Sequence, residues 1–202
     1  MDETDILSDY VDRFIQRFPR REALDLVLAG LGDRPACLVM DPGEETGLIR
    51  SYCNSLDLAF RIYGGDSELS RSGFFIAREK KRLEILENSE GRFYGLSDRD
   101  VGRFLGFPED DIDYFRHKVG EKDLESGARE KARDMASEGH LEEDSEEMLR
   151  LVTYVPRPEK ENIARAVKRG REHRNSLLKL GRERDRCFAR LLETVLDRPV
   201  DL

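Results

Sequence analysis

The sequence predicts an α+β fold, in which a small mixed sheet of about four strands is wrapped by helices and followed by a long C-terminal helix. Three observations predict it. Apolar residues recur at helical spacing near the start, short apolar runs lie between turn residues in the middle, and a long heptad-like pattern closes the chain. No composition shift marks a boundary, so residues 1–202 are expected to form a single α+β domain.

The first element is an amphipathic helix over residues 4–18, which Thr4 or Asp5 can cap. Its apolar residues recur every three or four positions: Ile6, Leu7, Tyr10, Val11, Phe14, Ile15 and Phe18. Pro19 suits the start of a second helix, which Gly32 and Asp33 end.

Strand-like segments follow. The run "PACLVM" (35–40) is typical of a buried strand, and a helix is expected near 44–55. Residues 58–65 and 73–78 predict two strands of a hairpin, because a turn-rich segment joins them. A helix at 79–88 comes next, and "RLVTYVPRP" (150–158) predicts a further strand closed by two prolines.

Charge is separated along the second half of the chain. Residues 121–147 hold eleven acidic and four basic residues, and this acidic excursion is expected to be a solvated helix and loop that can be mobile. Residues 156–190 hold twelve basic and five acidic residues. One or two long helices are expected over 159–197, where Gly170 and Gly181 can bend or divide them.

The composition limits the classes of function. Asp and Glu number 43 against 35 Lys and Arg, so the net charge of −8 repels nucleic acid and anionic membranes on average. No apolar run approaches the ~20 residues of a membrane span. The acidic start lacks a signal-peptide pattern, and the three separated cysteines favour free thiols, so a cytoplasmic location is expected. No cofactor and no metal site is expected, because the histidines and cysteines lack ligand spacing.

Residues 93–118 have the spacing of a helix-turn-helix. Ser97 can cap the first helix, Gly102 is small where two helices approach, and Gly106 allows the turn. The second helix begins with Glu109, Asp110 and Asp111. Such acidic residues favour a helix N-terminus but oppose the phosphates that a DNA-reading helix approaches. Two packed structural helices, or a surface that docks a protein partner, therefore explain the pattern better than DNA reading.

The stretch "YGLSDRDVGRFLGFPEDDIDYF" resembles a "GxFLGYPxxDVxxF" signature of archaeal proteins that are known only as a domain of unknown function, with clostridial relatives. "LAGLGDRPACL" is similar to a Gly-x-Lys-Pro-Ala segment of the clostridial group, with Arg34 in place of lysine. The resemblance implies no catalytic residue. It implies a shared structural or docking role for the motif, and the candidate docking residues are Gly106, Pro108, Asp110, Asp111 and Tyr114.

Chemistry is weakly indicated elsewhere. Cys53 with His117 is a conceivable nucleophile and base, although a small buried cysteine is the plainer interpretation. Three residues on or near neighbouring strands are candidates for an anion-binding pocket of an enzyme of unrecognised class: Arg61, Arg78 and Tyr94. Charge pairing on a sheet surface is the alternative explanation for the two arginines.

The closing helix carries arginines around an apolar seam. Residues 163–195 can pack on the core of the chain or form a homodimer seam. The arginines can pair with the acidic segment 121–147, or contact nucleic acid; the candidates are Arg165, Arg169, Arg171, Arg182 and Arg186. Together these observations favour a non-enzymatic regulatory or adaptor protein that binds a protein partner, with nucleic-acid binding and an unrecognised enzyme as alternatives.

Overall fold

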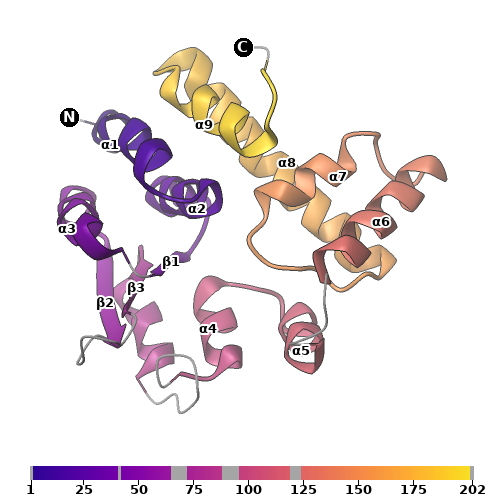
Figure 1. The fold of residues 1–202 in the computed structure, drawn as a ribbon, viewed down its shortest axis with the longest axis horizontal. Coiled ribbons are helices and arrows are strands. Elements are labelled where there is room, and N and C mark those ends of the chain that lie inside the picture. Colours follow the sequence, from indigo (N-terminus) through magenta and orange to yellow (C-terminus); the bar gives the residue numbers. More distant parts are fainter. Residues whose placement is uncertain (1, 41, 65–71, 88–95, 119–123, 201–202) are drawn as a thin grey trace. The chain divides into compact units, whose positions relative to one another are not determined.

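The computed structural model describes residues 2–40, 42–64, 72–87, 96–118 and 124–200 (Figure 1). It forms two compact units, residues 1–107 and residues 108–202, and each is described by itself. The first unit contains the sheet, and the described part of the second unit is helical. The α+β class and the long C-terminal helix are therefore confirmed.

The first unit opens with two packed helices, α1 (Glu3–Arg17) and α2 (Arg20–Leu31). The cap of α1 is Asp2, not Thr4 or Asp5, because Asp2 accepts a hydrogen bond from the Thr4 amide while Asp5 bonds back to the Asp2 amide. Pro19 precedes α2, and Gly32 ends it with a φ of 79°, as the sequence indicates.

The sheet has three described strands in the order β1-β3-β2: β1 (Ala36–Met40), β3 (Ser72–Ala77) and β2 (Ala59–Gly64). Both pairings are antiparallel, so the expectation of a mixed sheet was wrong. Between β1 and β2 lie η1 (Gly43–Glu45) and α3 (Thr46–Ser55), which confirm the helix near 44–55.

Strand alternation gives the sheet two faces. On one face, Phe75 and Ala77 pack with Leu83 of η2 (Lys80–Leu86) and Phe104 of α4 (Asp98–Leu105). On the other, the Arg50 side chain of α3 lies over the stacked rings of Phe60 and Phe74. The segment expected to be a helix at 79–88 thus forms a tighter 3-10 helix against the sheet.

The second unit contains α5 (Glu109–Lys118), α6 (Leu124–Ser137), α7 (Ser145–Met148), η3 (Leu149–Leu151), α8 (Lys160–Glu183) and α9 (Cys187–Leu196). Elements α6, α7, η3 and α9 all pack against α8. In the described part of the acidic excursion, the buried residues Ala128, Ala132 and Met135 fix α6 in this unit.

The strand expected at 150–158 was wrong. Leu151 ends a 3-10 turn, and Leu151 and Val152 are buried in a helical unit that offers no strand among its described residues. Pro156 and Pro158 lack the amide that a ladder needs. The expected sheet of about four strands therefore has three in the described chain.

The closing helices divide at Arg184–Arg186 and at neither glycine. Asp185 explains the break, because its Oδ1 accepts a hydrogen bond from the Cys187 amide at 2.9 Å and so starts α9. Gly170 lies inside α8, where a Cβ would stand 2.0 Å from the Met148 carbonyl oxygen. This glycine therefore permits close packing and introduces no bend.

Candidate functional site

The predicted docking residues are divided between the two units. Gly106 belongs to the first unit and the other four to the second. Gly106 ends α4 with a φ of 79°, and a Cβ there would lie 2.6 Å from Pro35 Cγ. The Pro108 carbonyl accepts a hydrogen bond from the Ile112 amide at 2.9 Å and so begins α5. Both residues thus have local structural roles.

Asp111 is an internal group of the second unit. Its side chain is 1% exposed, and its Oδ1 accepts hydrogen bonds from the Arg157 amide and from Asn162 Nδ2, each at 2.8 Å. Its Oδ2 accepts one from Arg165 at 2.8 Å. Three donors therefore hold α5 against the start of α8, and the Asp111 carboxylate does not lie on the surface.

Asp110 joins the same cluster from its exposed side. Its carboxylate binds Arg165 at 2.9 Å and Asn162 at 2.8 Å. Burial raises the pKa of Asp110, but the hydrogen bonds from Asn162 and Arg165 and the charge of Arg165 outweigh it, so the pKa lies below its ordinary value. We call Asp110, Asp111, Asn162 and Arg165 the α5–α8 clasp.

The candidate anion-binding residues lie apart. Arg78 donates to the Gly30 carbonyl at 2.7 Å and pairs with Glu3, so it joins the N-terminal helices to the end of β3. Arg61 pairs with Glu87 at 2.7 Å on the face that carries η2. Tyr94 lies outside the described residues. Arg61 and Arg78 therefore have separate partners and do not converge on one site, and each is in an ion pair.

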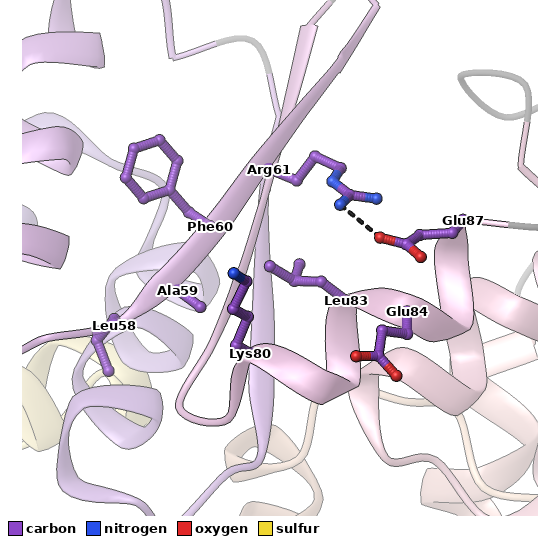
Figure 2. A pocket seen from close by; sticks show the side chains of 8 residues that line it. All are labelled: Leu58, Ala59, Phe60, Arg61, Lys80, Leu83, Glu84 and Glu87. Atoms are coloured by element: carbon purple, nitrogen blue, oxygen red, sulfur yellow. Dashed lines mark hydrogen bonds and ion pairs between the residues drawn. The ribbon is translucent and has the colours of Figure 1, made fainter.

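A groove of about 360 Å³ nevertheless adjoins Arg61 (Figure 2). One wall is β2 and the residue before it, and the other is η2. The lining residues are Leu58, Ala59, Phe60, Arg61, Lys80, Leu83, Glu84 and Glu87. Figure 2 shows Lys80 on one side of Leu83, and Glu84 with Glu87 on the other side. We call this feature the β2–η2 groove.

The charge around the groove is only partly neutralised. Hydrogen bonds from Arg61 to Tyr63 and Glu87 raise the pKa of the Arg61 guanidinium, which is therefore firmly engaged. Lys80 is exposed and makes no ion pair with any residue that the structure describes. Its neighbour Lys81 binds Glu79 at 2.8 Å. Among the residues that the structure describes, Lys80 is thus the groove cation that is available to a ligand.

The arginines expected to contact nucleic acid fall into two groups. Arg165 is in the clasp, Arg169 pairs with Glu172 at 3.2 Å, and Arg171 pairs with Glu142 at 3.0 Å and Asp144 at 2.9 Å. The last two contacts confirm the expected pairing between the closing helix and the acidic segment. Arg182 and Arg186 are exposed and have no ion pair within the described chain.

The candidate nucleophile has the wrong surroundings. Burial raises the pKa of the Cys53 thiol to about 12, which keeps it protonated at neutral pH. Cys53 belongs to the first unit, whereas His117 belongs to the second and bonds the Asp113 carbonyl through Nδ1 at 2.6 Å. The described residues contain no cluster of ligands fit for a metal ion. None of the described helices combines the length and apolar character that a membrane crossing needs.

Sequence reasoning missed most of the groove. The sequence predicts only a helix over the segment that holds Lys80, Leu83, Glu84 and Glu87. Leu83 and Leu86 are its two buried residues, and their three-residue spacing is a signal for a 3-10 helix with one face against a sheet.

Comparisons with known proteins give no assignment: no family model, no curated protein and no solved structure matches the chain. The resemblance carried by residues 93–118 therefore stays a prediction.

Proposed function

We propose that this chain is a non-enzymatic adaptor that binds a protein partner, and that an extended segment of the partner lies in the β2–η2 groove. The observation that carries the proposal is an edge strand with a groove beside it. β2 pairs with β3 on one side, and no described backbone group pairs with Ala59–Gly64 on the other.

An unpaired strand edge is a ready template for another strand. Its outward amides and carbonyls bond to water until a partner strand supplies the same hydrogen bonds in a regular row. Peptide-binding domains use this addition, in which main-chain bonds provide affinity and pockets beside the edge provide specificity. The half-buried residues of β2 and the adjoining groove supply both components.

The lining of the groove suits a polypeptide segment. Leu58, Ala59 and Leu83 offer apolar contact, while Arg61 and Lys80 with Glu84 and Glu87 surround them with charge. An apolar centre with a polar rim is the usual anatomy of a protein interface. A row of main-chain hydrogen bonds beside such a centre requires an extended chain as the ligand.

Two alternatives have less support. Binding of nucleic acid depends on Arg182 and Arg186, because the other three candidate arginines already bind carboxylates of their own unit. Two exposed cations contribute little affinity in a chain of net charge −8. An enzyme with an anion pocket depends on Arg61 and Arg78, which the structure separates and pairs with Glu87 and Glu3.

Selection from a displayed library of random twelve-residue peptides tests the proposal. The purified chain should enrich peptides that slow hydrogen exchange of β2 amides at least tenfold, measured by NMR, because added strand bonds protect them. The amides of β1, at the opposite edge of the sheet, serve as the internal control. Peptides that leave β2 exchange unchanged, or no enrichment at all, would show that the charged side chains only guard this edge against pairing.

A further inference from the structure

The charge on the groove deepens this function, and the inference rests on the proposed role of β2. We infer that the segment bound beside β2 carries an acidic side chain, which lies against Lys80, and an apolar side chain two positions away, which lies on Leu83.

The cations in and beside the groove differ in whether they already have a partner. Arg61 is held by Glu87 and by the Tyr63 hydroxyl, at 2.7 and 3.3 Å. Arg82, two positions from Lys80, donates to the carbonyls of Arg103 and Phe104 at 2.9 and 2.7 Å. Both guanidiniums are committed to partners, and Lys80 remains the groove cation without one in the described chain.

The Lys80 side chain lies where a ligand beside β2 would meet it. Figure 2 shows the Lys80 side chain running toward β2 beside Ala59, with Leu83 next to it. Glu84 and Glu87 lie beyond Leu83, and neither pairs with Lys80 in the described chain. A carboxylate placed there gains an ion pair, whereas a second cation meets like charge.

The spacing of side chains in an extended ligand decides which of its residues meets Leu83. Alternate residues of an extended chain point the same way and are ~6.6 Å apart. A segment that lays an acidic side chain on Lys80 therefore presents its next same-side residue to Leu83, a largely buried residue that lines the groove and favours an apolar group. The expected ligand motif is an acidic residue and an apolar residue separated by one residue of any type. Which of the two comes first depends on the direction in which the segment runs along β2.

The test uses the peptides selected above. Aspartate or glutamate should be enriched two positions from an apolar residue. Lys80→Glu should weaken binding of such a peptide at least fivefold, because an exposed attraction becomes a repulsion. Replacing the acidic residue of the peptide by lysine should restore binding to Lys80→Glu and weaken binding to the unchanged chain.

Lys81→Glu is the matched control. Lys81 is the adjacent lysine, is also exposed and pairs with Glu79 outside the groove, so affinity should stay within twofold. Peptides that protect the β2 amides yet bind Lys80→Glu as well as the unchanged chain would overturn this inference and leave the adaptor proposal standing. Peptides that never touch β2 would overturn both.

Discussion

Asp25 in the first unit and Asp111 in the second are both buried carboxylates, but their surroundings differ. Asp25 on α2 binds the guanidinium of Arg34, and both side chains are nearly inaccessible. Asp111 accepts bonds from a backbone amide, a side-chain amide and a guanidinium. The first is a simple ion pair inside an apolar core, and the second is a hydrogen-bonded junction between two helices.

The pKa values of Asp25 and of Asp110, which lies beside Asp111 in the clasp, move in opposite directions. Burial raises the pKa of Asp25, and the attraction of Arg34 and Arg21 does not cancel it. At Asp110, the exposed member of the clasp, hydrogen bonds and charge outweigh burial and lower the pKa. The donors around the half-exposed Asp110 thus stabilise its charged form, whereas at the buried Asp25 the cost of desolvation exceeds the attraction of the neighbouring cations.

The largest expected effect comes from breaking the junction. Asp111→Ala leaves the Arg157 amide without its acceptor and leaves Asn162 and Arg165 with only the Asp110 carboxylate, which should lower the free energy of unfolding by about 3–5 kcal/mol. Urea unfolding followed by circular dichroism measures it. Asp113→Ala, on the exposed side of the same helix, is the control and should cost under about 1 kcal/mol. Equal losses would mean that the clasp is not a junction.

The ion pair of the first unit should behave differently. Arg34→Met alone leaves a buried carboxylate unpaired and should cost about 3–5 kcal/mol. Adding Asp25→Leu should recover most of that loss, because apolar groups can replace a buried pair with little net change. Urea unfolding of the single and double variants measures the recovery. If the double variant is no more stable than Arg34→Met, the fold requires the Asp25 carboxylate as it requires that of Asp111.

Asp25 and Asp110 should contribute to the pH dependence of stability with opposite signs. The raised pKa of Asp25 means that the folded state holds its proton more tightly, so its contribution to stability falls as pH rises from the ordinary value of 3.8 to the raised pKa. The lowered pKa of Asp110 gives a contribution that is complete above 3.8 and is lost as pH falls through the lowered pKa.

Thermal unfolding from pH 3 to pH 6 measures both contributions against asparagine variants. The stability of Asp25→Asn relative to the unchanged chain should rise with pH by no more than about 1.4 kcal/mol per unit. The stability deficit of Asp110→Asn relative to the unchanged chain should also grow as pH rises from 3 to 4. This change should be much smaller, because solvent screens the half-exposed Asp110. Differences of the same sign would contradict the assignment.

The smallest effect is expected at the exposed pair of the groove. Arg61 and Glu87 are 39% and 45% exposed, so Glu87→Gln should change stability by less than about 1 kcal/mol. Urea unfolding checks this value. A larger loss would mean that this pair supports the groove as the clasp supports α5.

Local sequence signals predicted the elements of the first unit well. Pro19 and Gly32 mark the limits of α2, and the apolar runs at 35–40, 58–65 and 73–78 became strands. Ser97 caps α4 as expected, with the Asp100 amide bonding to its hydroxyl at 3.1 Å. These signals depend on neighbours within a few residues, which a single sequence displays.

The errors arose where distant contacts decide the outcome. Residues 150–158 carry a strand-like pattern, but α7, α8 and α9 pack against η3 at its start and supply no ladder. Asp111 was expected at the surface, because nothing near it in sequence reveals that Asn162 and Arg165 lie beside it. The groove depends in the same way on η2 packing against β2.

The contact between Gly170 and the Met148 carbonyl has a consequence for ancestry. A methyl group cannot fit where 2.0 Å separates its site from a carbonyl oxygen, so inheritance of this helical arrangement should preserve glycine there while surface arginines drift. Any descendant that keeps this packing of α8 should therefore keep glycine at this position.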